Sequence, residues 1–418
     1  MTAAPSTPGG MTTDAHERRA APRTELFDGA YAGRRVLVTG DTGFKGSWLC
    51  AWLSDLGATV GGYALAPPTS PSLFWLTGMD REVAHAAGDV RDLAGLAAAV
   101  AAFRPELVFH LAAQPLVRPS YGDPRGTFET NVMGVVNLLE AVRTCPSVRV
   151  VVNVTSDKCY ENGETNHPLR ETDALGGHDP YSASKGASEL VTASYRRSFF
   201  GPTSAVRLAT ARAGNVIGGG DWAADRLVPD CVRALVAGRE IVVRRPAAVR
   251  PWQHVLESLS GYLWLGARLL GDGHSYDGAW NFGPSTAAVP VAEVVAEFIA
   301  AFGSGSWRAA EPAGGPAGEL HEAGRLVLDC GKSRDELGWT GVWDTSTAVR
   351  RTAAWYRTWA AGAAKPSDAA EPSDVAARRD AAELRGALEA DIESYVAAAK
   401  ALGACWAQAL PDARGGRG

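Results

Sequence analysis

The sequence predicts an α/β protein built on a doubly wound parallel sheet (Rossmann-like), followed by a smaller C-terminal substrate-binding lobe. Three observations support this prediction. Short apolar, β-branched runs alternate with helical segments between Arg34 and Ala213, a glycine-rich loop follows the first run, and shorter elements punctuated by Gly and Pro follow Gly214. Strands that alternate with helices favour parallel pairing, because a helical crossover returns the chain to the same end of the sheet.

Hydrophobic periodicity places the elements in order. The predicted strands are 35–39, 59–63, 107–111, 149–155 and 205–211. The predicted helices are 46–56, 93–103, 125–143, 182–199, 229–237, 257–270, 291–302 and 381–402. Gly57 ends the first helix, since glycine is favoured just after a helix C-terminus.

Charge and composition argue against several classes of protein. The 46 acidic and 41 basic residues leave a net charge of −5, which argues against a nucleic-acid binder. The apolar stretches are too short to span a bilayer, and no apolar segment typical of a secretory signal follows the basic residues near the N-terminus. The six cysteines show no CxxC and no metal-ligand spacing, so we expect reduced thiols, no metal site and a cytoplasmic location.

The loop after the first strand is Gly40-Asp41-Thr42-Gly43-Phe44-Lys45-Gly46. Its glycines would let backbone N–H groups approach a diphosphate, and the following helix N-terminus favours that charge. An ordinary glycine-rich turn is the alternative, because the pattern alone is weak. Asp89 fits either an adenine contact or a solvated loop acid. Residues 62–65 hold neither a ribose-binding acid nor an Arg, and we still favour NAD.

Tyr181-Ser182-Ala183-Ser184-Lys185 places Tyr181 and Lys185 on one helix face. A nearby ammonium should pull the pKa of Tyr181 toward neutrality, so that the phenolate could take a proton from a sugar hydroxyl. This spacing is often only a surface pair on a helix. Downstream of the glycine loop and of Ser156 at a strand end, it favours catalysis.

Thr155-Ser156-Asp157-Lys158 stands at the carboxyl end of the predicted strand 149–155, the edge where doubly wound sheets bind ligands. A hydroxyl, an acid and an amine in sequence can orient a carbonyl, donate a proton and accept one. Ser156 and Asp157 can also cap a helix or turn, and composition alone favours that structural role.

With further blocks, these motifs resemble the extended short-chain dehydrogenase/reductase family and, within it, the CDP-glucose branch of the sugar-nucleotide 4,6-dehydratases. The blocks are Thr39–Leu49, His110–Pro115, Thr155–Asn162, Asp179–Gly186, Ala213–Trp222 and Arg250–Val255. Asp157-Lys158 is similar to the pair in the CDP-glucose branch, where related dehydratases typically carry Asp-Glu. Asp41 departs from the family loop, which usually has His there.

The resemblance implies an internal oxidation, dehydration and reduction of a nucleotide-linked glucose, with NAD as a held cofactor, for deoxysugar biosynthesis. It implies that the catalytic residues are Ser156, Asp157, Lys158, Tyr181 and Lys185. It implies that the cofactor contacts Gly40, Thr42, Gly43, Phe44, Lys45, Gly46, Asp89, Val90, Leu111, Ala112, Ala113, Thr155, Tyr181 and Lys185. It implies that the substrate contacts Gln114, Ser156, Asn215, Arg226 and Arg250, with surface salt bridges as the alternative for the two arginines.

In the implied mechanism, Tyr181 deprotonates the carbon-4 hydroxyl and Ser156 binds the carbonyl oxygen. Asp157 protonates the departing carbon-6 hydroxyl, and Lys158 takes the carbon-5 proton. The resemblance also implies a homodimer or homotetramer through the helices near 125–143 and 182–199.

We expect a disordered leader over 1–26 and an NAD-binding Rossmann domain over 27–213, to which segments near 250–285 return. A sugar-nucleotide-binding lobe should occupy mainly 214–360, and a linker or insertion, a C-terminal helix and a tail should fill 361–418. Three alternatives remain open: another sugar-nucleotide 4,6-dehydratase, a 4-epimerase that would not need Asp157 and Lys158, and a non-catalytic NAD-binding sensor. A sensor would be expected to lack part of the Ser/Tyr/Lys set.

Overall fold

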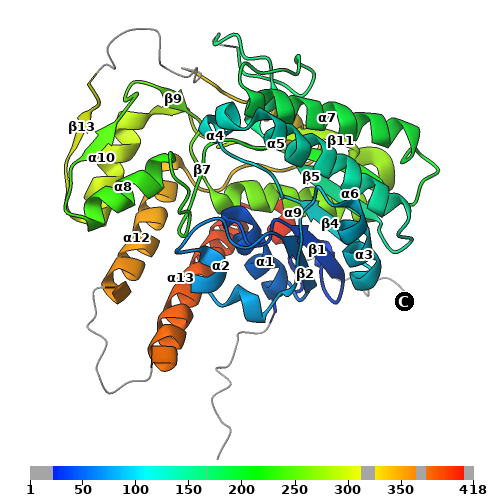
Figure 1. The fold of residues 1–418 in the computed structure, drawn as a ribbon, viewed down its shortest axis with the longest axis horizontal. Coiled ribbons are helices and arrows are strands. Elements are labelled where there is room, and N and C mark those ends of the chain that lie inside the picture. The colour runs from blue at the N-terminus through cyan, green and yellow to red at the C-terminus, as the bar shows by residue number, and fades with distance from the viewer. Residues whose placement is uncertain (1–21, 166, 312–324, 364–372, 409–418) are drawn as a thin grey trace, which may run out of the picture.

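The computed structural model describes residues 22–165, 167–311, 325–363 and 373–408. A seven-stranded sheet in the order β11-β6-β5-β4-β1-β2-β3 forms its centre (Figure 1). Its strands are β1 (Arg35–Thr39), β2 (Thr59–Ala64), β3 (Ala84–Ala87), β4 (Leu107–His110), β5 (Val150–Val154), β6 (Arg207–Arg212) and β11 (Gly278–Asn281). Every neighbouring pair is parallel. The predicted doubly wound parallel sheet is therefore confirmed.

Side chains alternate between two cores, one on each face of the sheet. Val36 and Val38 of β1 belong to a core with helices α1 (Phe44–Asp55) and α9 (Val255–Gly271). Leu37 belongs to the other core, with α3 (Leu93–Phe103), α6 (Gly134–Arg143) and α7 (Pro180–Ser198). Because successive strand residues point to opposite faces, an apolar run is the pattern expected of a strand covered on both sides.

The predicted helix 125–143 is interrupted in the structure. It consists of α5 (Pro124–Phe128), a π-helical turn η3 (Glu129–Met133) and α6. Buried Asn131 lies in that turn, where its amide donates to the Ser184 hydroxyl at 2.8 Å and to the Gln114 carbonyl at 3.0 Å. Such bulges often occur at functional sites, and this one ties the loop after β4 to α7.

A smaller lobe lies beside the sheet in Figure 1. Its main elements are α8 (Leu227–Val236), β8 (Ile241–Val243), β9 (Val249–Arg250), β12 (Val289–Pro290), α10 (Val291–Phe302), β13 (Trp307–Ala309) and α12 (Thr345–Ala363). Other short elements are α2 (Leu73–Leu76), α4 (Val117–Gly122), β7 (Val216–Ile217), β10 (Gln253–His254) and α11 (Gly331–Asp335). The periodicity had indicated neither β11 nor α12.

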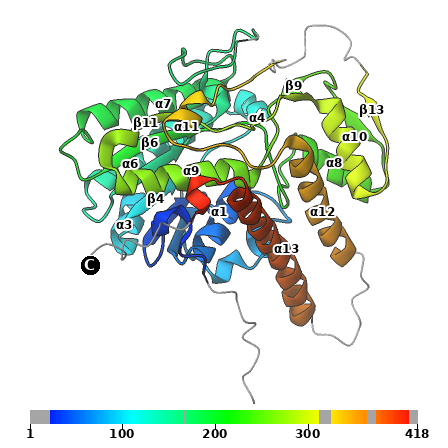
Figure 2. The ribbon, with the colours of Figure 1, turned by 180° about the vertical axis from the view of Figure 1, so that it is seen from behind.

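The two ends of the described chain meet beside α1 and α9 (Figure 2). Arg23 pairs with Asp55 at 2.6 Å and Leu26 is 1% exposed, so the packed chain begins inside the expected leader 1–26. Helix α13 (Ser373–Ala401) begins within the expected linker, and α12 continues to Ala363. The rest of the expected leader (1–21), the middle of the linker (364–372) and the expected tail lie outside the described residues.

Within the described ranges, no helix combines the length and the apolar character needed to cross a membrane. The same part of the chain holds no group of three or more His, Cys, Asp or Glu side chains arranged as metal ligands.

Candidate active site

A cavity of about 1070 Å³ opens at the carboxyl edge of the sheet. The loops after β1, β4 and β5 line it on one side, and the segment 213–230 with β8 and β9 lines it on the other. The strand order reverses between β1 and β4, the position where open α/β sheets bind their ligands.

The structure brings nearly all of the expected site residues to this cavity. Its wall includes Gly40, Thr42, Gly43, Phe44, Lys45, Gly46, Asp89, Val90, Leu111, Ala112, Ala113, Thr155, Ser156, Asp157, Lys158, Tyr181, Lys185, Asn215, Arg226 and Arg250.

Gln114 is the exception among the expected site residues. Its amide donates to the Leu116 carbonyl and the Thr127 hydroxyl, both at 3.0 Å, and its Oε1 accepts from Leu116 N at 2.6 Å. Gln114 is not part of the cavity wall and its side chain braces the loop after β4, while the expected substrate contact stays a prediction. The motif shows which residue type stands there, whereas the direction of the side chain depends on partners in α4 and α5.

The glycine loop is packed against neighbouring backbone too tightly for side chains at Gly40 and Gly46. Gly40 has φ +76°, and a Cβ there would come within 2.8 Å of Ala112 N. A Cβ on Gly46 would meet the Gly40 carbonyl at 2.0 Å. The N-terminus of α1, capped by Gly43 without a side-chain hydrogen bond, faces the same cavity. A tight glycine cradle and a helix N-terminus fit the diphosphate of a dinucleotide.

Asp41, the departure from the family loop, points away from the cavity. Its carboxylate is fully buried over Gly62 of β2 and bonds His85 Nδ1 of β3 at 2.7 Å. Burial raises the pKa of Asp41, and His85 opposes that shift. The carboxylate therefore packs beneath the loop and leaves the anion-binding side to backbone N–H groups.

Tyr181 and Lys185 are buried on the face of α7 that meets the end of β5. Lys185 Nζ lies 3.4 Å from the Val154 carbonyl, and the Ser156 hydroxyl is near enough to Tyr181 to lower its pKa. Burial lowers the pKa of Lys185 to about 8. Burial also raises the pKa of Tyr181 to about 12, although Ser156 opposes that shift. The predicted fall of the Tyr181 pKa is thus wrong for the protein chain alone, because desolvation of the phenolate outweighs the neighbouring charges.

Asp157 occupies a confined position beside these groups. It is 2% exposed, and its Oδ1 accepts from the Ser156 hydroxyl at 2.9 Å. Its Oδ2 has no hydrogen-bond partner among the described residues, and a Cβ on Gly214 would come within 1.7 Å of it. A buried carboxyl oxygen without a partner suits a group that exchanges a proton with a bound substrate. Gly214, which sequence reasoning did not assign, makes room for it.

Lys45 extends from the glycine loop toward α9. Its ammonium donates to the Tyr262 hydroxyl of α9 at 3.2 Å and lies 5.4 Å from that ring centroid. Burial, together with the charges of Arg226 and Lys185, lowers the pKa of Lys45 to about 7, and Asp157 opposes the shift. Lys45 therefore belongs electrostatically to the catalytic group as well as to the cofactor loop.

Acidic side chains hold two of the arginines that line the cavity. Arg226 bonds Asp221 at 2.9 Å, and Arg244 bonds Asp225 at 2.9 Å. Arg118, from α4, approaches the same Asp225 carboxylate at 3.9 Å. Arg118 and Arg244 were not predicted, since no sequence spacing links α4 to β8. Guanidinium groups of this kind suit the phosphates of a nucleotide.

Comparison with known proteins agrees with this geometry. The family model described as GDP-mannose 4,6 dehydratase matches residues 37–268. The chain belongs to this family. The resemblance inferred from the motifs is therefore confirmed, and so is the expected short-chain dehydrogenase/reductase type of fold.

Relatives within the dehydratase family cover most of the chain. A CDP-glucose 4,6-dehydratase of Salmonella typhimurium is 46% identical over 79% of this chain and 93% of its own length. A dTDP-glucose 4,6-dehydratase of Streptomyces antibioticus is 30% identical over 77% and 92%. Among solved structures, a UDP-glucose 4-epimerase of Thermus thermophilus in complex with NAD superposes with a TM-score of 0.65 at 27% identity, covering 77% of this chain and 99% of that one. An NAD-bound dTDP-glucose 4,6-dehydratase of Streptomyces venezuelae gives 0.64 at 26%, covering 77% and 97%.

Proposed function

We propose that this protein is a CDP-glucose 4,6-dehydratase that holds NAD through its catalytic cycle. It converts CDP-D-glucose to CDP-4-dehydro-6-deoxy-D-glucose and water, for deoxysugar biosynthesis. The observation that carries the proposal is the Asp157-Lys158 pair directly after Ser156 at the end of β5. Oxidation at carbon 4 needs only Ser156, Tyr181 and Lys185, whereas loss of water needs a further acid and base. The 46% identity to the Salmonella enzyme supports CDP-glucose as the substrate.

The Gly40–Gly46 loop would hold NAD⁺, which would supply a hydride acceptor for carbon 4 and, once reduced, a hydride donor for carbon 6. Tyr181 removes the proton of the carbon-4 hydroxyl, and Ser156 hydrogen-bonds the resulting ketone oxygen. Burial raises the pKa of Tyr181 in the protein chain alone, so its role as a base requires the positive charge of bound NAD⁺ to offset that burial. The ketone acidifies carbon 5, from which Lys158 takes the proton. Asp157 protonates the carbon-6 hydroxyl, which leaves as water. Lys158 then returns its proton to carbon 5, so that the product differs from the substrate by one water.

The segment 213–230, with β8 and β9, is the expected nucleotide side of the cavity. Asn215, Arg226 and Arg250 are our candidates for contacts with the diphosphate or its neighbours. Arg226 lines the cavity, and its positive charge lowers the pKa values of both Tyr181 and Lys45. Water must be kept out of this site, because it could divert the unsaturated intermediate.

Product mass tests the function directly. Purified protein with NAD⁺ is incubated separately with CDP-, dTDP-, GDP- and UDP-glucose. We expect loss of one water, fastest with CDP-glucose. Faster conversion of dTDP-glucose would move the chain to another branch of the family, and a product of unchanged mass would indicate a 4-epimerase, the activity named for the Thermus neighbour.

We also propose a homodimer or homotetramer formed through the segment 124–143 and α7. Four large apolar side chains are exposed there: Phe128 (37%), Met133 (49%), Leu190 (59%) and Phe199 (48%). Light scattering during size-exclusion chromatography measures the mass, and a monomer would contradict the proposal. A cytoplasmic location is our further proposal, supported by the six free cysteines.

A further inference from the structure

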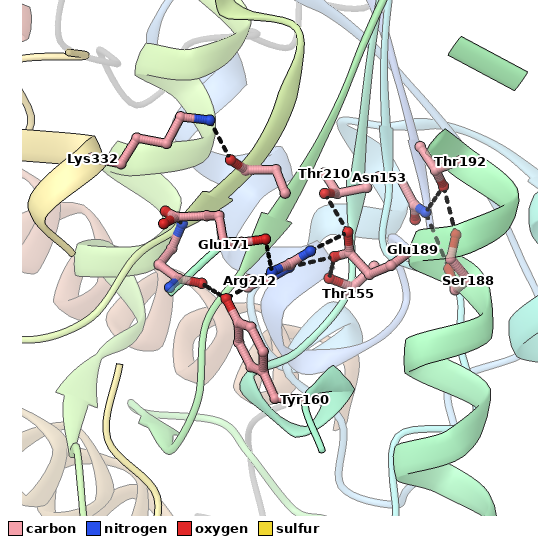
Figure 3. A network of polar contacts seen from close by, with 12 residues as sticks. Asn153, Thr155, Tyr160, Glu171, Ser188, Glu189, Thr192, Thr210, Arg212 and Lys332 are labelled. Atoms are coloured by element: carbon pink, nitrogen blue, oxygen red, sulfur yellow. Dashed lines mark hydrogen bonds and ion pairs between the residues drawn. The ribbon is translucent and has the colours of Figure 1, made fainter. Parts of the chain in front are cut away.

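We call the segment Thr155–Tyr160, which follows β5 and contains Ser156, Asp157 and Lys158, the catalytic turn. An ion pair between Glu189 and Arg212 contacts both of its ends (Figure 3). Arg212 of β6 donates through Nε and Nη2 to the two carboxylate oxygens of Glu189, at 2.9 and 2.8 Å. Glu189 stands on α7, one helical turn after Lys185 and two after Tyr181. The pair therefore connects the helix that carries the oxidation residues to the centre of the sheet.

The pair is buried and its hydrogen bonds are satisfied. Glu189 is 3% exposed and Arg212 is 2% exposed. Glu189 also accepts from the hydroxyls of Thr155 at 2.5 Å and Thr210 at 2.7 Å, and Arg212 Nη1 donates to the Tyr160 hydroxyl at 2.7 Å. Burying two charges costs about as much free energy as their attraction returns, so such a pair is weak evidence for stability. What it can supply is a defined arrangement of the groups that it bonds.

The groups that it bonds stand at both ends of the catalytic turn. Thr155, held by Glu189, directly precedes Ser156. Tyr160, held by Arg212, is the second residue after Lys158, and its hydroxyl donates onward to Asn281 Oδ1 at 2.7 Å. The Arg212 guanidinium carbon also lies 4.7 Å from the centroid of the Tyr160 ring.

The same turn lies very close to α7. A Cβ on Gly186 would come within 3.1 Å of the Cys159 carbonyl, so the helix and the turn approach more closely than most side chains allow. Even a small movement of the turn therefore changes the distances from its residues to Tyr181 and Lys185. Anchors at both ends limit such movement.

We propose that Tyr160, anchored by the Glu189–Arg212 pair, is a positioning residue for the dehydration half of the reaction. The Thr155 anchor adjoins Ser156, which acts in the oxidation, whereas the Tyr160 anchor adjoins Lys158 and the far end of the turn. Loss of the Tyr160 hydroxyl releases only that far end. This inference rests on the proposed dehydratase function, because Asp157 and Lys158 have no separate task in oxidation.

The test is Tyr160→Phe, which keeps the ring and its packing and removes only the hydroxyl. In a single-turnover mixture of enzyme, NAD⁺ and CDP-glucose, reduced nicotinamide absorbance follows oxidation, and product mass follows dehydration. We expect oxidation within about twofold of the wild-type rate and dehydration slower by roughly tenfold or more, since small misplacements of a catalytic group have effects of that size. Reduced cofactor should then accumulate on the enzyme.

Two control variants separate positioning from general loss of stability. Tyr31→Phe removes another buried tyrosine hydroxyl, which donates to the Leu263 carbonyl away from the site. Thr210→Val removes a bond to Glu189 without touching the turn. Both should lower the thermal unfolding midpoint, and Tyr31→Phe, which lies outside the Glu189–Arg212 network, should leave the ratio of the two half-reaction rates unchanged.

Equal slowing of both half-reactions in Tyr160→Phe, or accumulation of reduced cofactor in Tyr31→Phe, overturns the positioning role. A wild-type protein that dehydrates no nucleotide-linked glucose overturns the proposed function and the positioning role together, and that result is visible without any variant. Dehydration by the wild type with an unchanged rate ratio in Tyr160→Phe overturns the positioning role alone.

Discussion

The catalytic edge of the sheet and the region where the two chain ends meet bury their side chains differently. At the edge, the buried Glu189–Arg212 pair bonds hydroxyls from three different segments. At the chain ends, Trp406 lies between the rings of Phe27, at 4.9 Å, and Tyr395, at 5.8 Å, with Trp52 edge-on at 6.1 Å. All four of these aromatic side chains are fully buried.

The two regions also differ in how completely their polar atoms are bonded. The indole nitrogens of Trp52 and Trp406 have no hydrogen-bond partner among the described residues, whereas the pair at the edge has every charged atom bonded. The aromatic cluster is therefore held mainly by buried area and ring packing, which stabilise without demanding one arrangement. At the catalytic edge, the hydrogen bonds define the arrangement of the polar groups. At the ends of the described chain, stability depends mainly on the area that the aromatic side chains bury.

Tyr181→Phe has the largest expected effect and tests whether a change at the catalytic edge alters the rate without altering stability. We expect turnover to fall by roughly 10²–10⁴-fold, the scale of losing a general acid-base group, with little change in unfolding free energy. NAD binding should persist, because the Gly40–Gly46 loop and Lys185 are unaltered. Product mass gives the turnover and titration calorimetry gives NAD binding. Unchanged turnover would remove Tyr181 from the mechanism.

Trp406→Ala should have the opposite profile. Removing a buried indole typically costs about 3–5 kcal/mol of unfolding free energy, and the rate per folded molecule should not change. Trp406→Phe is the matched control: it keeps a ring between Phe27 and Tyr395 and removes the unbonded N–H, so we expect a much smaller loss. Denaturant unfolding measures both variants. A rate defect in folded Trp406→Ala would show that the two regions are coupled.

Lys158→Met sharpens the comparison within the edge itself. We expect overall dehydration to slow by roughly a hundredfold, the usual scale for a general base, while oxidation at carbon 4 survives. Reduced nicotinamide should accumulate in a single-turnover mixture. Wild-type rates, or loss of both steps together, would return Lys158 to a structural or substrate-binding role.

The smallest expected effect is the change of unfolding free energy with pH, which has opposite signs in the two regions. Near the chain ends, burial raises the pKa of Glu257 to about 7, even though it accepts from Val342 N and Trp343 N. The folded protein then binds a proton that the unfolded chain releases, so this contribution to stability is lost as pH rises from about 4.5 to about 7. Lys45 and Lys185, whose pKa values are lowered to about 7 and about 8, add stability as pH rises above those values.

Unfolding free energies of the wild type and of Glu257→Gln, measured across acid and neutral pH, isolate the carboxyl contribution. The wild type should lose stability relative to the variant as pH rises toward neutral. A difference between the two proteins that does not vary with pH would contradict the assigned burial effect.

Local sequence determined much of the secondary structure. The bounds of β1, α3 and α10 agree with the periodicity, because each has a regular apolar repeat and clear ends. The break at η3 was not predicted, since it depends on Asn131 finding partners on α7 and in the loop after β4. Strand β11 is held by pairing with β6, a distant segment, and its own Gly278–Asn281 run carries little strand signal.

The sequence by itself determined which chemical groups this site contains: the glycine loop, the Ser156-Asp157-Lys158 run and the Tyr181–Lys185 spacing all follow from local order. Only the tertiary structure decided where those groups point and what surrounds them. It turned Asp41 toward His85 and Gln114 into its own loop, and it buried Tyr181 enough to raise its pKa. The physical reason is that direction and desolvation depend on distant partners, so Arg212 and Glu189 meet behind the turn although no spacing in the sequence connects them.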